Sequence, residues 1–153
     1  MQLIEHKKAR LNYEILETLE AGIELLGFEV KSLRARHGVL DGAHIVVRPS
    51  GRGGTGEAYV VGMSIPPYQP GNTPADYDPL RTRRLLLTKK ELMELADFEH
   101  QKGLTIVPLS VYSKGRNLKL AVAVARGRKK YDKRAVMKER SAKREIERTL
   151  KNR

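Results

Sequence analysis

The sequence predicts a mainly β protein, a small antiparallel OB-type barrel with two or three short helices and a basic C-terminal tail. Several short segments alternate apolar and polar residues, as half-buried strands do. Turns containing glycine or proline separate these segments at the short intervals typical of all-β domains. The last part of the chain is rich in charge and poor in apolar residues. We therefore expect residues 1–125 to form an OB-like barrel and residues 126–153 to form the tail.

The N-terminal region is predicted to be a short basic lead followed by two strands. Residues 1–10 form the lead. A strand begins at Tyr13, where apolar residues alternate with glutamates. The pair Ala21-Gly22 is predicted to be a turn or bulge, and residues 23–26 to be a returning strand.

The next region is predicted to be a helix followed by two strands. Residues 28–36 carry apolar residues and intervening charges at helical spacing, and Gly38 ends this segment. Strands are expected over residues 43–48 and 57–63. Their connector, residues 49–56, is longer than a tight hairpin turn and is predicted to be mobile.

The second half of the chain is predicted to contain an irregular loop, three strands and a capped helix. Five of the seven prolines fall between residues 66 and 79, which disfavours a hydrogen-bonded ladder there. After a strand over residues 83–87, Thr88 and Glu91 have the spacing of a capping box, so a helix should begin there and run to Lys102. A hairpin follows, with strands over residues 104–112 and 117–125.

The charge of the chain is strongly positive and unevenly distributed. There are 30 Lys and Arg against 18 Asp and Glu, a formal net charge of +12. Residues 126–153 hold 13 basic and 4 acidic residues, so the tail carries +9 of this charge. Such a field favours a polyanionic partner, either a nucleic acid or an anionic membrane. Because apolar residues in the tail are too few to offset its ordering entropy, we expect it to be disordered when free and helical against a phosphate surface.

The sequence offers little for catalysis or metal binding. There is no cysteine, and the four histidines have no metal-ligand spacing. The glycine-rich run 51–56 lacks the lysine and hydroxyl of a phosphate loop. No long apolar segment or secretory signal is present, which is compatible with a cytoplasmic protein. We expect no cofactor, no metal, no membrane partner and no enzymatic activity, and a monomer when free.

Three short basic clusters lie within the predicted barrel, at residues 7–10, 31–36 and 81–84. Each cluster alone is commonly a solvated surface. OB barrels, however, bind nucleic acid through one face and its bordering loops. If the three clusters meet at one barrel surface, they favour RNA, whose unpaired bases and 2′-hydroxyls such a surface can recognise.

Several long segments of the chain resemble the SmpB family. They are LETLEAGIELLGFEVKSLRA (16–35), GEAYVVG (56–62), DPLRTRRLLLTKKEL (78–92), GLTIVPLSVYSKGRNLKL (103–120) and ARGRKKYDKR (125–134). They occur in order and span nearly the whole chain. The resemblance implies an OB-type barrel that binds the tRNA-like domain of transfer-messenger RNA (tmRNA). It also implies delivery of tmRNA to stalled ribosomes in trans-translation, with the tail in the decoding centre and the empty mRNA channel of the small subunit.

The resemblance further implies particular site residues. Glu20 and Leu86 match positions at the tmRNA interface, and the tail motif needed for accommodation in the ribosome matches Asp132, Lys133 and Arg134. Basic residues of the three clusters are additional candidates for contact with the tmRNA backbone: Lys7, Arg10, Lys31, Arg34, Arg83 and Arg84. The remaining candidates for ribosome binding lie in the tail: Gly127, Lys129, Lys130, Tyr131, Arg140 and Arg144.

The chain departs from the family pattern at two places that bear on binding. Tyr131 stands where many members have histidine, and a tyrosine can stack on a base but carries no positive charge. Residues 36–44, RHGVLDGAH, depart from the family pattern GKANL-S-D-x-Y. No binding role is carried over to that stretch.

Two other functions stay open from the residues alone. A generic OB-type RNA-binding or ribosome-associated protein has the same charge and barrel, and would bind tRNA-like and random RNA equally well at moderate salt. An RNA nuclease with carboxylates at the barrel edge is the second alternative, and it would cleave RNA in the presence of magnesium.

Overall fold

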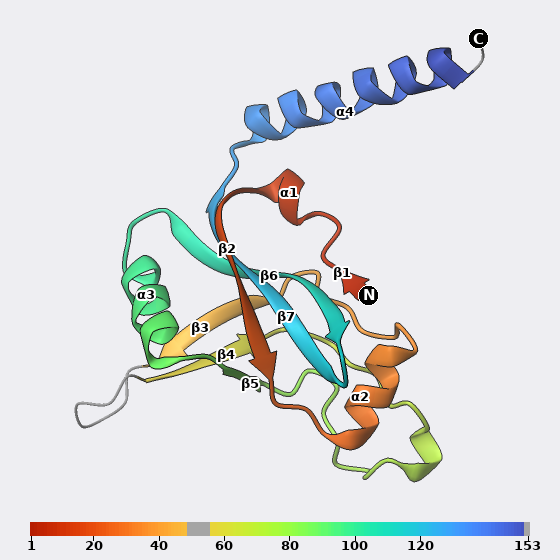
Figure 1. Cartoon of the computed structure of the whole chain (residues 1–153), viewed down its shortest axis with the longest axis vertical. Helices are drawn as coiled ribbons and strands as arrows, with labels where there is room; N and C mark the ends of the chain where they lie inside the picture. The colour runs from red at the N-terminus through yellow and green to blue at the C-terminus, as the bar shows by residue number, and fades with distance from the viewer. Residues whose placement is uncertain (49–55, 152–153) are drawn as a thin grey trace.

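In the part of the chain that the structure describes, seven antiparallel strands form one strongly curved sheet, seen in Figure 1. The structure is a computed structural model, and it describes residues 1–48 and 56–151. The strand order across the sheet is β1-β6-β7-β2-β5-β4-β3. The strands are β1 (Gln2–Glu5), β2 (Tyr13–Ile23), β3 (His44–Arg48), β4 (Glu57–Val61), β5 (Arg83–Leu86), β6 (Leu104–Lys114) and β7 (Asn117–Gly127).

Four α-helices accompany the sheet in the described residues, and α3 packs against β3 and β6. They are α1 (Ala9–Asn12), α2 (Gly27–Arg34), α3 (Lys89–Glu99) and α4 (Lys130–Lys151). Among the described residues no ladder joins β1 to β3, so hydrogen bonds do not close the barrel. Glu99 on α3 accepts a hydrogen bond of 2.6 Å from the Val47 amide of β3, which ties the helix to this edge. The predicted mainly β, OB-type fold is therefore confirmed, as an open barrel.

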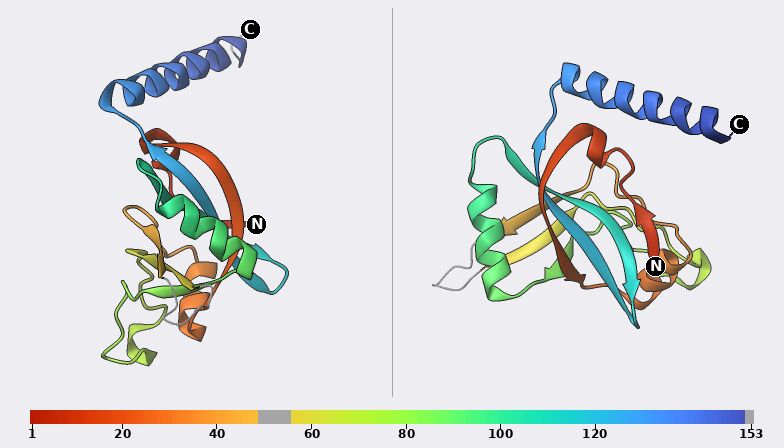
Figure 2. Two further views of the ribbon diagram at one scale, coloured as in Figure 1. Left: turned by 90° about the vertical axis from the view of Figure 1, so that its left-hand side faces the viewer. Right: turned by 45° about the horizontal axis from the view of Figure 1, so that its top comes forward.

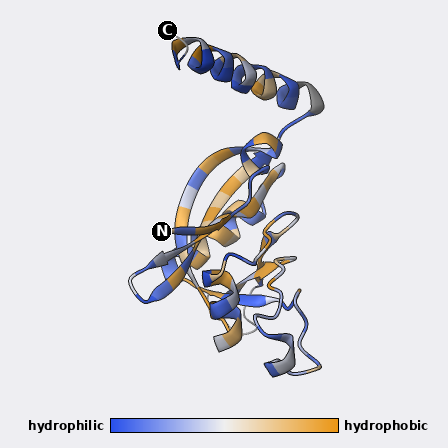
Figure 3. Ribbon diagram, turned by 90° about the vertical axis from the view of Figure 1, so that its right-hand side faces the viewer, coloured by the Kyte–Doolittle hydropathy of each residue, from blue (hydrophilic) through white to orange (hydrophobic). Residues whose placement is uncertain are grey.

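Alternation along the strands places the core on the inner face of the sheet. On β7, Leu118, Leu120, Val122 and Val124 are buried in the main core, whereas Lys119 points to the outer face. The mixture of apolar and polar positions along each strand is visible in Figure 3. Towards the end of β7 the outer face is covered, because Ala123 and Ala125 are buried there with Val107 in a second apolar cluster. The part of the outer face around Lys119 is left to carry a binding surface.

A buried ion pair fixes α2 against β5. Glu29 and Arg83 are both fully buried, and the Arg83 Nε atom donates to Glu29 Oε2 at 2.8 Å. Arg81 also donates to this carboxylate, and the Tyr77 hydroxyl lies 2.9 Å from it. Burial alone raises the pKa of Glu29, but the hydrogen bonds from Arg81, the Leu26 amide and Arg83 outweigh it, so the pKa lies below its usual value.

Most of the predicted elements are present. The helix predicted over 28–36 is α2, and the predicted hairpin is formed by β6 and β7. At the start of α3, the Glu91 amide donates to Thr88 Oγ1 at 3.2 Å, and Glu91 Oε1 accepts from the Thr88 amide at 3.0 Å, which confirms the capping box. The proline-rich segment 66–79 forms one short 3₁₀ turn, Pro70–Asn72, and no strand, as predicted.

Several predicted boundaries differ from the structure. The helix α3 ends at Glu99 and not at Lys102, and β4 ends at Val61 and not at Met63. The N-terminal lead forms β1 and α1, because β1 pairs with β6. The prediction of a turn at Ala21-Gly22 and a returning strand over 23–26 is wrong: β2 continues to Ile23, and Gly22 pairs with both Lys119 and Leu86. Strand β7 runs to Gly127, two residues beyond the predicted barrel. The connector predicted over 49–56 lies, except for Gly56, outside the described residues.

The helix α4 stands away from the sheet, as Figures 1 and 2 show from three sides. Its larger apolar side chains are exposed: Met137 to 56%, Ile146 to 61% and Leu150 to 62%. Its beginning is tied to the barrel by Arg128, whose amide donates to the Asn12 carbonyl at 2.8 Å. The tail is thus anchored at its root and makes little contact along its length.

Candidate nucleic-acid interface

Glu20 and Leu86 lie on neighbouring strands and line one hollow on the outer face of the sheet. The two strands, β2 and β5, pair through Gly22 and Leu86. The hollow has a volume of about 430 Å³, and we call it the Glu20 hollow. Its lining includes Glu20, Gly22, Arg84, Leu86, Thr88 and Lys119. The structure therefore brings together the two residues that the family resemblance implied for the tmRNA interface.

Leu86 forms an apolar platform on this polar face. Its side chain is 53% exposed, although it lies in the sheet. A Cβ atom at Gly22 would lie 3.0 Å from the Leu86 Cβ atom, so glycine allows Leu86 to lie close over β2. A second hollow of about 350 Å³ shares Gly22, Leu86 and Lys119 and adds Arg116. An exposed leucine between two such hollows can pack against a ribose or the face of a base.

Glu20 is held by two side chains of the β6–β7 hairpin. The Tyr112 hydroxyl donates to its carboxylate, and Lys114 Nζ lies 3.2 Å from Oε1. These contacts, with the Tyr112 hydrogen bond as the largest effect, lower the pKa of Glu20. Burial and the neighbouring carboxylate raise the pKa of Tyr112 to about 12. At neutral pH the site therefore presents a fixed carboxylate, which can accept hydrogen bonds from base amino groups or a 2′-hydroxyl.

Exposed basic side chains flank this surface. Arg84 lines the Glu20 hollow and lies 3.6 Å from Glu57. Arg34 on α2 donates to the Arg116 carbonyl at 3.0 Å, which places the end of α2 beside the tip of the β6–β7 hairpin. Lys31 is exposed on the same helix. The clusters at 31–36 and 81–84 thus approach one face through Arg34 and Arg84.

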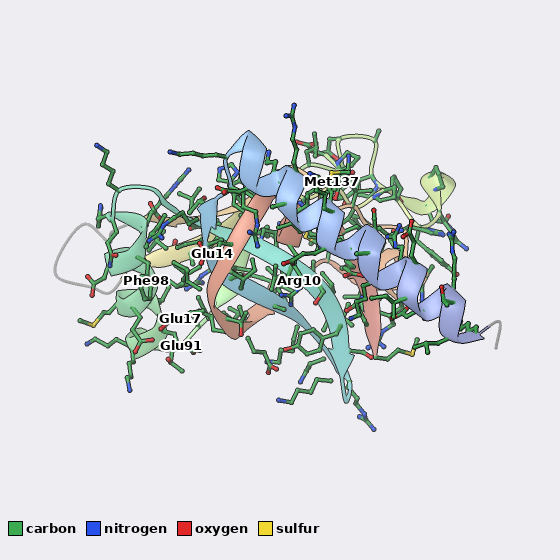
Figure 4. All side chains as sticks on the ribbon, turned by 90° about the horizontal axis from the view of Figure 1, so that it is seen from above. Arg10, Glu14, Glu17, Glu91, Phe98 and Met137 are labelled. Atoms are coloured by element: carbon green, nitrogen blue, oxygen red, sulfur yellow. The ribbon has the colours of Figure 1, made fainter. Side chains whose placement is uncertain are left out.

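Lys7 and Arg10 line a third hollow of about 440 Å³ on the same sheet. Thr18, which precedes Glu20 by two residues on β2, lies in its wall. Arg140 of α4 also reaches this hollow. Figure 4 shows α4 crossing above the end of the barrel where Arg10 lies. The third basic cluster therefore joins the same surface and meets the tail there.

Arg83 does not belong to this surface, and its prediction as a backbone contact is corrected. It is fully buried, and its guanidinium is occupied by Glu29 and by the carbonyls of Met63, Pro79 and Arg81. Neighbouring residues of a strand face opposite sides, so Arg83 shares the inner face with Leu85 while Arg84 points outward. Its function in the structure is to neutralise Glu29.

The candidate residues of the tail lie at the end of β7 and along α4. Gly127, Lys129, Arg134, Arg140 and Arg144 are exposed, and Lys133 is half-buried. The Asp132 carboxylate accepts from the Lys129 amide at 3.4 Å, at the N-terminus of α4, where a negative charge is favourable. The side chains of Lys130 and Tyr131 lie outside the described part of the chain.

Sequence reasoning missed the hairpin residues of the interface. Tyr112 and Lys114 hold Glu20, and Arg116 and Lys119 line the second hollow. The available signal was the hairpin register, which pairs Tyr112 with Lys119 and predicts that both face the same side.

Residues 1–48 and 56–151 contain no group of three or more His, Cys, Asp or Glu side chains arranged to hold a metal ion. Within the same ranges, every helix is too short or too polar to span a membrane.

An open OB-type barrel with a cationic outer face, an exposed leucine and a fixed carboxylate defines a protein of the RNA-binding barrel class. The chain belongs to the SmpB family: the family model described as "SmpB protein" matches residues 3–152. The chain is 47% identical to the SsrA-binding protein of Clostridium botulinum strain Hall, over 99% of this chain and 92% of that protein. Identity to the SsrA-binding protein of Clostridium kluyveri is 48%, with the same coverage.

A solved structure is also similar. Its description is "tmRNA-SmpB: a journey to the center of the bacterial ribosome". The chain is 44% identical to its counterpart there, with a TM-score of 0.66 over 85% of this chain and 87% of that one. The similarity in fold therefore accompanies the similarity in sequence.

Proposed function

We propose that this chain binds the tRNA-like domain of tmRNA and delivers it to stalled ribosomes in trans-translation. The observation that carries the proposal is that Glu20 and Leu86 line one hollow together with Arg84 and Lys119. The cations attract the phosphate backbone without regard to sequence. The carboxylate and the leucine add contacts that depend on where bases and riboses lie, so a folded RNA is distinguished by its shape.

The experiment compares the tRNA-like domain with random RNA of equal length over a series of salt concentrations. Phosphate contacts weaken as salt rises, whereas shape-dependent contacts are retained better. We expect the tRNA-like domain to keep a clear advantage at moderate salt. Equal affinity for both RNAs would favour a generic RNA-binding protein.

We propose a separate function for the tail. Residues 126–153 would be disordered in the free protein and would become helical in the decoding centre and empty mRNA channel of the ribosome. The exposure of Met137, Ile146 and Leu150 supports this division, because little apolar burial holds α4 in place. Ribosomal RNA would be contacted by the basic side chains of the tail and by Tyr131. The basic residues are Lys129, Lys130, Lys133, Arg134, Arg140 and Arg144.

We further propose that the protein is not an enzyme and that it acts in the cytoplasm, where ribosomes translate. Its function is to position RNA, because the interface consists of hydrogen-bonding, apolar and cationic side chains that hold an RNA in place. Incubating the protein with tmRNA and magnesium tests this point: intact RNA is expected, and cleavage products would favour the nuclease alternative.

A further inference from the structure

Arg36 has a backbone conformation that normally requires glycine. Its φ is 65°, and it alone among the non-glycine residues of the described chain has a positive φ. It follows α2, where its amide donates to the Leu33 carbonyl at 2.9 Å and the His37 amide donates to the Ser32 carbonyl at 3.0 Å. These two bonds form a Schellman motif with Arg36 at the position that is most often glycine. The backbone at Arg36 is therefore strained relative to glycine.

Close packing fixes this strained turn beside β1. A Cβ atom at Gly38 would lie 2.7 Å from Leu33 Cδ2 and 2.8 Å from Ile4 Cδ1, closer than real contacts allow. The chain at residues 36–38 therefore lies directly against both α2 and β1. Because the turn is held on two sides, Arg36 has a defined position next to β1.

Arg36 and Lys7 line the same polar hollow of about 390 Å³. Both side chains are exposed, and in the described residues neither belongs to an ion pair. Gln2 and Glu5 also line the hollow, and Gln2 Nε2 donates to Glu5 Oε2 at 3.2 Å. Two cations thus face one carboxylate, and the lining has a net positive charge.

This hollow continues the interface already described. Gln2, Glu5 and Lys7 line both this hollow and the one that contains Arg10 and Arg140. Lys7 is therefore shared by two adjoining cationic hollows. The strain at Arg36 does nothing for the fold, since glycine would make the same turn more easily, and within the described residues its guanidinium makes no hydrogen bond.

We propose that Arg36 and Lys7 form a phosphate-binding site for the RNA backbone, which extends the interface around the end of α2. The proposal rests on the proposed function for the identity of the RNA. A guanidinium can bind a phosphate through two parallel hydrogen bonds, and an ammonium beside it adds a second positive charge. Phosphate contacts of this kind position an RNA and do not read its sequence.

The test uses the full chain with Arg36→Gly, and measures both RNA affinity and melting temperature. Because glycine relieves the strain, we expect the melting temperature to rise by about 2–4 °C. Loss of the phosphate contact should weaken binding of the tRNA-like domain about tenfold. The slope of log affinity against log salt should fall in magnitude by about 0.9. Stability and affinity are thus expected to change in opposite directions.

Three further variants complete the design. Lys7→Gln should reduce the salt slope in the same way, and Arg36→Lys should retain most of the slope. Lys102→Gly removes an exposed cation that lines none of these hollows, so its slope should match the parent protein. Parental affinity and salt slope in Arg36→Gly would overturn the phosphate site. Failure of the parent protein to prefer the tRNA-like domain would instead refute the proposed function and leave the phosphate site to be judged by the slopes.

Discussion

The hydroxyl of Tyr112 on β6 donates a hydrogen bond to the carboxylate of Glu20 on β2, although β7 lies between these two strands. Lys114 reaches the same carboxylate from the hairpin tip. Glu20 is thereby held as an ionised acceptor on a face whose other prominent side chains are cationic or apolar. A fixed carboxylate cannot turn away from an RNA phosphate, so it admits only an arrangement that places a base amino group or a 2′-hydroxyl against it.

Replacing Glu20 by alanine should weaken binding to the tRNA-like domain without destabilising the protein. The loss should be roughly tenfold to a hundredfold, the range for a polar contact removed from an interface. The melting temperature should stay within a degree or so of the parent value, because surface substitutions have small effects. Glu24→Ala, at an exposed position just beyond the end of β2, is the matched control and should bind normally. An unaltered dissociation constant for Glu20→Ala would remove Glu20 from the interface.

Replacing Tyr112 by phenylalanine should free the Glu20 carboxylate and raise its pKa towards the ordinary value. RNA affinity should then fall, but by less than in Glu20→Ala, because the carboxylate remains. The reverse experiment measures the pKa of Tyr112 by ultraviolet absorbance during alkaline titration. Glu20→Gln should lower this pKa from about 12. Tyr68→Phe is the control, since Tyr68 is exposed and lines none of the four hollows. Identical titration of Tyr112 with and without Glu20 would disprove the coupling.

Replacing Glu29 by glutamine should destabilise the barrel by about 3–5 kcal/mol, because Arg83 would be left buried without its counter-charge. Urea denaturation at neutral pH measures this difference. The control, Glu94→Gln, changes an exposed carboxylate on α3 and should be nearly neutral.

Glu29 should also account for part of the acid sensitivity. Since its pKa in the folded protein lies below the ordinary value of 4.5, its contribution is present above that pH and is lost as pH falls through the lowered folded value. The free energy of unfolding of the parent protein should therefore decline more steeply below pH 4.5 than that of Glu29→Gln. Parallel declines would contradict this assignment.

The tail should show fast amide exchange in the free protein. Its apolar side chains are exposed, and most of the stability of a protein helix comes from packing of its apolar face. Hydrogen exchange followed by NMR should therefore find little protection over residues 135–150, in contrast to β6 and β7. Addition of ribosomes should protect the same amides. Slow exchange over 135–150 in the ribosome-free sample would show that α4 is stable without a partner.

Local signals in the sequence were sufficient for several elements. The capping box at Thr88 and the hairpin around residues 113–116 depend on neighbouring residues, so both could be predicted. β1 could not, because it is stabilised by pairing with β6, more than 100 positions away. Pairing on both sides also outweighed the turn preference of Gly22, which lies within β2 between β7 and β5.

The candidate site was predictable where it depended on recognisable segments, and less so where it depended on burial. Glu20 and Leu86 came from the family resemblance and lie together in the structure. Arg83 looked like part of a basic surface cluster, yet its partner Glu29 is 54 positions away and nothing local indicates it. Strand alternation does indicate that Arg83 shares a face with the buried Leu85. Whether a basic residue in a strand is exposed therefore has to be judged from the face of the strand on which it lies.

The most direct measurement is peptide tagging in a reconstituted translation system with ribosomes stalled on a truncated message. It compares the full chain, a chain shortened after Lys129 and a reaction without the protein. The cut lies beyond β7 and the Arg128 contacts, so the barrel should remain folded. We expect the full chain to support tagging, and the shortened chain to bind tmRNA with nearly full affinity but not to support tagging. Equal tagging with the shortened chain, or tagging without any protein, would contradict the division between an RNA-binding barrel and a tail that acts on the ribosome.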